Sequence, residues 1–151
     1  MHKTIISDTS CLIVLTNIGE LELLHKVYGF IVTTIEIATE YGETLPEWIR
    51  IETVKDKYCQ QLLEMQIDKG ESSAIALAIE MTDSTIILDD YKARKIATQL
   101  GLNFTGTIGV IVKAKLKGII PSIKPLLEKV KKTDFRLSEE IELLALKEAN
   151  E

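Results

Sequence analysis

The apolar residues of this chain change spacing repeatedly, from short continuous runs to the three-to-four-residue spacing of helices. The run Ile86-Ile87-Leu88 is the clearest strand, because no polar residue interrupts it. Strands are expected at residues 4–7, 30–32, 49–54, 84–88 and 102–104. Alternating strands and helices predict the α/β fold class, as a three-layer α/β/α sandwich with a central, mostly parallel sheet.

Helical spacing fills the intervals between these strands and continues after the last one. Helices are expected over residues 11–28 with a break at Gly19, then over a stretch that Thr33 or Thr34 caps and that runs to Gly42. Further helices are expected at 56–67, from Glu71 onward, at 91–100, and in three stretches broken at 118–121 and near 133. Residues 138–151 form an amphipathic pattern, which predicts a helix that covers an edge or contacts a partner. No linker or repeat appears, so we expect one domain over residues 1–151, with a core from about 4 to 132.

Composition excludes several classes of protein. Of 151 residues, 46% are hydrophobic and 27% charged, and no apolar stretch is long enough to cross a bilayer. Residues 1–8 lack the apolar core and cleavage site of a signal peptide, so we expect a cytoplasmic protein. Cys11 and Cys59 are expected to be reduced core residues, and His2 and His25 to lie at the surface, because none has the spacing of a zinc site or triad.

Charge is segregated along the chain. Residues 1–90 carry 6 basic and 16 acidic side chains, whereas residues 91–137 carry 11 basic and 2 acidic ones. A basic segment behind an acidic one favours binding of phosphates close to carboxylates. The alternative is that the lysines of this segment, such as Lys113, Lys115 and Lys117, solvate the outer faces of helices.

Four acids lie where an alternating fold would gather them at one edge of the sheet: Asp8, Glu40, Glu71 and Asp89. Two carboxylates at roughly 4 Å repel by several kcal/mol at an effective dielectric near 20, so such a cluster favours protons or a cation. Each acid also has a simpler interpretation. Asp8 and Glu71 could stabilise helix N-termini, and Glu40 could face solvent on one helix face with Glu36.

Other polar residues flank these acids. Thr9 and Ser10 follow the first aspartate, where a hydroxyl can fix a carboxylate rotamer, so Ser10 is expected to support the site. Thr105 and Thr107 could do the same, contact substrate through their backbone, or cap the helix after Gly106. Arg94 and Lys92 lie within about one turn of Asp89 and could hold a scissile phosphate, although Lys92 also suits a solvated face. Asp90 is expected to support the site, or to cap its helix and face outward.

Five motifs in a fixed order carry a resemblance to a known family. They are Ile-Ile-Ser-Asp-Thr-Ser at 5–10, Glu40, Asp-Lys-Gly-Glu-Ser-Ser-Ala-Ile-Ala-Leu-Ala at 68–78, Ile-Leu-Asp-Asp-Tyr-Lys-Ala-Arg at 87–94, and Thr-Gly-Thr-Ile-Gly-Val at 105–110. Together they resemble a PIN domain over about residues 4–132. In particular, the chain is similar to prokaryotic PIN-like proteins of unassigned function related to VapC-type toxins.

The resemblance implies a metal-dependent ribonuclease fold in which four acids bind magnesium or manganese: Asp8, Glu40, Glu71 and Asp89. Many toxins of the family have aspartate at the position of Glu71, and the doublet Asp89-Asp90 offers two candidate ligands. An all-carboxylate site agrees with Mg²⁺ or Mn²⁺, whereas zinc favours histidine and cysteine. Such metals activate water and stabilise the leaving oxygen in phosphodiester hydrolysis.

We therefore expect an Mg²⁺- or Mn²⁺-dependent endoribonuclease, as the toxin of a type II toxin–antitoxin pair. The resemblance also implies a homodimer and a cognate antitoxin protein. The alternative is a catalytically silent PIN-like module for RNA binding or protein assembly, which metal binding would distinguish. A phosphohydrolase is disfavoured, because its nucleophilic aspartate needs a nearby lysine or a second aspartate two residues on, whereas Asp8 precedes Thr9 and Ser10.

Overall fold

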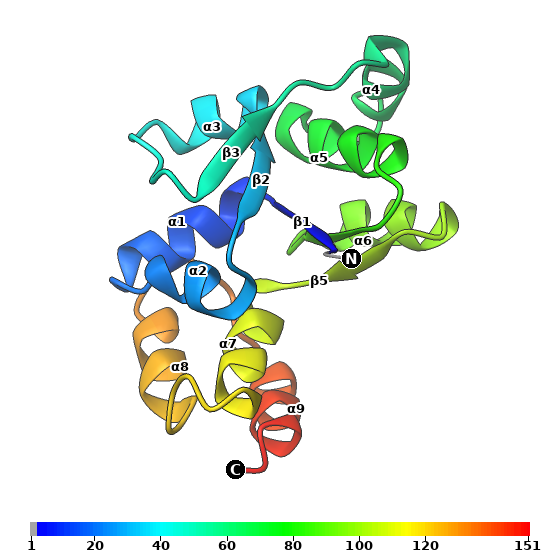
Figure 1. The fold of residues 1–151 in the computed structure, drawn as a ribbon. Helices are drawn as coiled ribbons and strands as arrows, with labels where there is room; N and C mark the ends of the chain where they lie inside the picture. Colours follow the sequence, from blue (N-terminus) through cyan, green and yellow to red (C-terminus); the bar gives the residue numbers. More distant parts are fainter. Residues whose placement is uncertain (1–2) are drawn as a thin grey trace.

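Five parallel strands form the central sheet of the computed structural model, which describes residues 3–151 (Figure 1). They are β1 (Thr4–Ser7), β2 (Ile31–Thr34), β3 (Ile49–Glu52), β4 (Ser84–Ile87) and β5 (Asn103–Thr105), in the spatial order β3-β2-β1-β4-β5. All the pairings are parallel. The predicted three-layer α/β/α fold is confirmed, and the sheet is wholly parallel.

The helices of the described residues lie between and after these strands. They are α1 (Thr9–Asn17), α2 (Glu22–Tyr28), α3 (Ile35–Tyr41), α4 (Lys57–Leu63), α5 (Lys69–Glu80), α6 (Tyr91–Gln99), α7 (Thr107–Leu116), α8 (Lys124–Lys131) and α9 (Glu139–Glu148). Helix α5 packs across β1, β2 and β4, and α6 packs on β5. Helices α2 and α3 pack on β2, and α2 and α1 also contact α7, which completes the layers on the two sides of the sheet (Figure 1).

Short polar side chains set where the helices begin. The residue before each of six helices accepts a hydrogen bond from a backbone N–H of the first turn: Asp8 for α1, Thr34 for α3, Asp56 for α4, Asp68 for α5, Asp90 for α6 and Ser138 for α9. Gly42, with φ of 76°, ends α3 in the left-handed conformation that glycine adopts most easily. Thr33, the other predicted cap, lies in β2 instead and donates its hydroxyl to the carbonyl of Ser7.

Two predicted boundaries differ from the structure for a local reason. Helix α5 begins at Lys69 and not at Glu71, because Asp68 is the capping residue. Strand β3 ends at Glu52, although the apolar pattern continues to Val54, because Val54 is buried without joining the ladder to β2.

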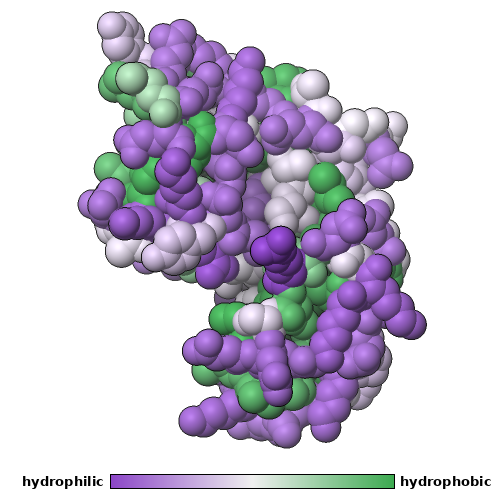
Figure 2. All heavy atoms as spheres, turned by 180° about the vertical axis from the view of Figure 1, so that it is seen from behind, coloured by the Kyte–Doolittle hydropathy of each residue, from purple (hydrophilic) through white to green (hydrophobic). Residues whose placement is uncertain are grey.

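The C-terminal segment forms the predicted helix, which packs on α7 (Figure 1). Part of its apolar face stays exposed, at Ile141, Leu143 and Leu144. Figure 2 shows apolar atoms exposed among hydrophilic ones on the lobe that contains α7, α8 and α9. No helix within residues 3–151 is long and apolar enough to cross a membrane.

The cysteines and the histidine at position 25 are placed partly as expected. Cys11 is fully buried, but Cys59 is only half-buried, so the expectation of two core cysteines is wrong for Cys59. His25 stacks on Trp48 and shares a hydrogen bond with the carbonyl of Gly29. His2 lies outside the described residues.

Candidate functional site

Asp8 and Asp89 meet at the carboxyl ends of β1 and β4, the two central strands between which the strand order reverses. In open parallel sheets this switch point is where ligands bind. The Asp8 backbone N–H donates to the carbonyl of Ile87, and the Asp89 N–H donates to Asp8 Oδ2 at 2.9 Å. Asp8 Oδ1 accepts a 2.9 Å hydrogen bond from the N–H of Cys11. Asp8 therefore both caps helix α1 and forms part of the acid cluster.

Three donors fix the Asp89 carboxylate. Thr107 donates its backbone N–H to Oδ1 at 2.8 Å and its hydroxyl to Oδ2 at 2.6 Å. Ser10 donates its hydroxyl to the same Oδ2 at 2.7 Å. The structure thus brings two of the hydroxyls that sequence analysis singled out, those of Ser10 and Thr107, onto one carboxylate, which they hold in a single rotamer. The cap of α7 is Gly106, so the Thr107 side chain has no capping role.

Arg94 lies beside this pair. Its Nε donates to the carbonyl of Leu88 at 2.5 Å, and its charge acts on Asp8 to favour the ionised carboxylate. A β-carbon at Gly106 would overlap the Arg94 guanidinium and crowd Asp89 Oδ1, so the glycine allows both groups to approach. Within the described residues, Arg94 forms no ion pair with an aspartate or glutamate.

Glu40 reaches the site from α3. Thr9, the first residue of α1, donates its hydroxyl to Glu40 Oε1 at 2.5 Å. A β-carbon at Gly70 would overlap the Glu40 carboxylate, so this carboxylate lies directly against the first turn of α5. Glu40 is solvent-exposed as a residue, yet its side chain is tied to two other elements.

Glu71 lies in the first turn of α5, next to the capping residue Asp68. Burial, a hydrogen bond with Asp68, and the charges of Asp68, Asp90 and Asp8 raise the pKa of Glu71 to about 8. Asp90 caps α6 by accepting the N–H of Ala93 at 2.9 Å, as one of its predicted roles required. Its charge nevertheless contributes to the site through Glu71.

The electrostatic state of the central pair follows from burial and like charge. Burial, and then the charge of Asp89, raise the pKa of Asp8 well above its usual range, against the opposing effect of two backbone N–H groups and Arg94. The same causes, burial followed by Asp8 and Asp89, raise the pKa of the Cys11 thiol. Cys11 is therefore a protonated core residue beneath the site and not a nucleophile.

Some predicted residues are not brought to the acids. Lys92 is exposed on α6 without a hydrogen bond or ion pair in the described chain, and the Thr105 hydroxyl lies against Gly109. The two lysines of α7 and the one at its C-cap contact other regions: Lys113 Nζ lies 5.0 Å from the Tyr28 ring centroid, Lys115 bonds Glu151, and Lys117 donates to the carbonyl of Val27. Within residues 3–151, no three acidic, histidine or cysteine side chains lie close enough together to hold one ion as they stand.

Three residues of the site had no assigned role in the sequence interpretation: Asp68, Gly70 and Gly106. The hydroxyl of Thr9 was expected to bond a carboxylate, but not specifically that of Glu40. Asp68 carried a readable signal, because an aspartate three residues before Glu71 fits a helix cap. Nothing in the neighbouring sequence indicated the roles of the two glycines, because the side chains that lie against them belong to distant segments: Glu40 against Gly70, and Arg94 and Asp89 against Gly106.

The fold and the paired aspartates at its switch point define an all-parallel α/β/α protein with an acidic site at the carboxyl edge of the sheet. The chain matches the family model described as a PIN domain over residues 4–151. It therefore belongs to the PIN-domain family, whose fold is nuclease-like. Comparison with curated proteins and with solved structures found no significant match.

Proposed function

We propose that the protein is an Mg²⁺- or Mn²⁺-dependent endoribonuclease that hydrolyses RNA phosphodiester bonds. The main support is the pair formed by Asp8 and Asp89, which are held together in the fold although burial and the charge of Asp89 disfavour ionisation of Asp8. A bound cation would offset that repulsion, and a cation is what PIN-type nucleases use. Glu40 and Glu71 complete the proposed catalytic set.

The donor set fits a hard cation. The four side chains offer oxygen atoms alone, as Mg²⁺ and Mn²⁺ prefer. Each oxygen of Asp8 accepts one hydrogen bond and so retains a lone pair, and the same holds for Asp89 Oδ1. We assign Asp8 and Asp89 as the principal ligands, with Glu40 and Glu71 binding directly or through water. When bound, the metal would activate water and stabilise the leaving oxygen.

The other residues position these groups. Thr107 and Ser10 hold the Asp89 carboxylate, and Thr9 holds Glu40, so two of the acids are oriented before any ligand arrives. Arg94, anchored through Nε and free of ion pairs in the described chain, is placed to contact the scissile phosphate with its remaining donors. Lys92 would add a weaker, exposed phosphate contact. Asp90 supports the site through the cap of α6 and its charge.

A cytoplasmic toxin of a type II toxin–antitoxin pair is the biological setting that we propose for this activity. Its support is the resemblance to VapC-type toxins in the five motifs of the sequence. Expression of the wild type should then arrest growth, and expression of Asp8→Asn should not. A cognate antitoxin protein would restore growth in cells that express the wild type.

The test of the nuclease proposal is cleavage of a structured RNA pool by the wild type and by Asp8→Asn, with Mg²⁺, with Mn²⁺ and with a chelator. Asparagine keeps an oxygen that can cap α1, so the variant should fold. Asp83→Asn, in an exposed position before β4, is the matched control and should cleave like the wild type.

Metal-dependent cleavage that is lost only in Asp8→Asn supports the proposal. Cleavage by Asp8→Asn removes Asp8 from the mechanism, and a folded wild type that neither cleaves nor binds Mn²⁺ favours a silent binding module.

A further inference from the structure

Strand β3 is an edge of the sheet, and its outer backbone groups face away from β2. The N–H of Ile31 donates to the carbonyl of Trp48, and Ile31 is in register with Ile49. In a parallel ladder, alternate residues turn their N–H and C=O toward the neighbouring strand. The backbone N–H and C=O groups that point toward β2 are therefore those of Arg50 and Glu52, together with the carbonyl of Trp48. The backbone groups of Ile49 and Ile51 point outward. Consistent with this, the N–H of Ile49 donates to Pro46 and not to β2.

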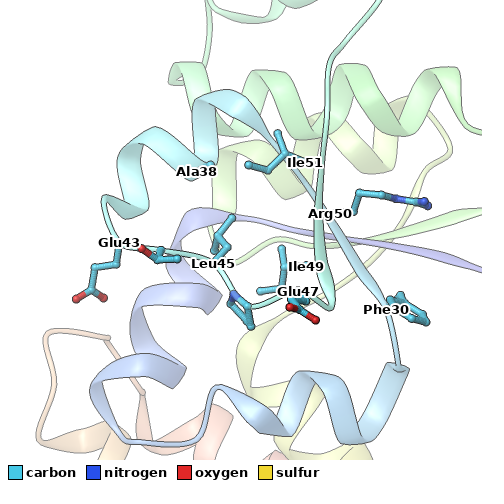
Figure 3. Close-up of a pocket in the computed structure, with 10 residues that line it drawn as sticks. Phe30, Ala38, Glu43, Leu45, Glu47, Ile49, Arg50 and Ile51 are labelled. Carbon is cyan, nitrogen blue, oxygen red and sulfur yellow. The ribbon is translucent and has the colours of Figure 1, made fainter.

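The side chains of β3 alternate in chemistry as well. The side chains of Arg50 and Glu52 lie on one face of the strand, with Arg50 Nε 3.4 Å from Glu52 Oε1. The side chains of Ile49 and Ile51 lie on the other face. Figure 3 shows Ile51 directed toward Ala38 and Arg50 directed the opposite way. Ile51 is 45% exposed although it is apolar and central in the strand.

An apolar cleft of about 760 Å³ adjoins this edge, lined in part by Leu45, Ile49, Ile51 and the 75% exposed ring of Phe30 (Figure 3). An open edge with apolar side chains is a surface on which another strand can add, and natural edges often carry charges that prevent such pairing. The charges of β3 do not prevent every pairing. Its two charged residues, Arg50 and Glu52, have opposite signs, so a second copy of the strand that runs in the opposite direction can place each charge opposite its counterpart.

We propose that two copies of the chain pair through β3, antiparallel, about a twofold axis at Ile51. In this register the outward N–H and C=O of Ile51 bond the partner's Ile51, Arg50 faces the partner's Glu52, and Glu52 faces the partner's Arg50. Opposite charges directly across an antiparallel pair stabilise it, and like charges destabilise it. A twofold axis at Arg50 or Glu52 would instead oppose like charges, and the backbone groups of those residues already face β2.

Two independent features thus select the same register: the outward backbone groups fall on odd-numbered residues, and the charges match when the axis lies at Ile51. The pairing would bury Ile51 against its counterpart beside the apolar cleft. Because the strands are antiparallel, the two acidic sites would lie at opposite ends of a continuous sheet and act separately. The inference goes beyond the nuclease proposal and does not depend on it.

The test is a charge exchange, measured as molar mass by sedimentation or light scattering without RNA or metal. The wild type should have twice the chain mass of 16.9 kDa. Arg50→Glu places glutamate opposite glutamate, and Glu52→Arg places arginine opposite arginine, so each variant alone should dimerise about tenfold or more weakly. An equimolar mixture of the two should restore the dimer, because each then supplies the charges that the other lacks. Lys124→Glu, an exposed change on α8, should stay dimeric.

Ile51→Pro provides a second, backbone test. Proline at this position removes an N–H that faces outward and leaves the ladder to β2 intact, which edge strands tolerate. The variant should be monomeric with a melting temperature close to that of the wild type. A monomeric wild type, dimeric single-charge variants, a mixture that fails to associate, or a dimeric Ile51→Pro would each overturn the proposal. A monomeric wild type would leave this edge to a strand of another protein.

Discussion

Two carboxylates of this protein both accept hydrogen bonds but have pKa shifts of opposite sign. Asp8 lies at the carboxyl end of the central strand β1, and Glu151 lies in the C-terminal lobe. Glu151 accepts the hydroxyl of Ser122, the N–H of Ile123 and the ammonium of Lys115. The Ser122 and Ile123 hydrogen bonds, followed by Lys115, lower the pKa of Glu151 to about 2. Asp8 accepts two backbone N–H groups, yet its pKa is raised.

The difference lies in burial and in the neighbouring charge. Asp8 is 3% exposed and faces Asp89, whereas Glu151 has a lysine within 3.2 Å. Backbone donors alone do not compensate a buried carboxylate that faces another one. The chain therefore stabilises the negative charge at its C-terminal lobe and leaves the charge of Asp8 only partly compensated, as the proposed cation site requires.

The largest expected effect is stabilisation by metal. If a cation compensates the acids, Mn²⁺ at about 100 times its dissociation constant should stabilise the fold by about 2.7 kcal/mol, or roughly 5–10 °C in melting temperature. Asp89→Asn should lose most of this increase, while the control Asp83→Asn keeps it. Thermal melts with and without Mn²⁺ measure the effect. An equal increase in Asp89→Asn would contradict the assignment of Asp89 as a ligand.

Loss of one orienting hydroxyl should have the next largest effect. Thr107→Val preserves shape and the backbone N–H to Asp89 Oδ1 but removes the hydroxyl that bonds Oδ2. Groups that orient metal ligands contribute about 10- to 100-fold to activity or metal affinity, so RNA cleavage should fall by that factor. Thr133→Val, which removes a hydroxyl bond on the C-terminal lobe, is the control and should cleave like the wild type. Unchanged cleavage in Thr107→Val would show that the Ser10 hydroxyl and the backbone N–H of residue 107 suffice to orient Asp89.

The sequence predicted the strands and the alternation that places Asp8 and Asp89 at one edge, because runs such as Ile86-Ile87-Leu88 contain no polar residue. Helix caps were partly readable, as at Thr34, since capping depends on neighbouring residues. The family motifs supplied the order of the acids. Local patterns therefore sufficed for the arrangement of the sheet.

Contacts between distant segments could not be read in the same way. The approach of Glu40 to Gly70 depends on the packing of α3 against α5, and nothing near Gly70 in the sequence indicates which side chain needs the space. The basic segment is a second example. Its lysines at 113, 115 and 117 contact Tyr28, Glu151 and Val27, and their positions along the sequence did not reveal these partners.

Glu71 offers a smaller test of the uncompensated region. Its pKa of about 8 means that the folded chain keeps a proton that the unfolded chain releases near pH 4.5, so metal-free stability falls as pH rises between these values. Glu71→Gln has no such charge and should be more stable than the wild type at pH 8, with little difference at pH 4.5. Metal-free melts across this range measure the effect, with Glu43→Gln, an exposed loop change, as control. A wild type more stable than Glu71→Gln at pH 8 would contradict the proposed repulsion.

Glu151 should give the smallest effect, with the opposite sign. Its folded pKa lies below the usual glutamate value of 4.5, so its contribution to stability is present above pH 4.5 and is lost as pH falls toward about 2. Glu151→Gln should therefore melt below the wild type at neutral pH, and the two curves should converge in acid. Glu148→Gln, exposed on α9, should match the wild type throughout. If Glu151→Gln were as stable as the wild type at neutral pH, Lys115 and Ser122 would not compensate this carboxylate, and the contrast with Asp8 would rest on burial alone.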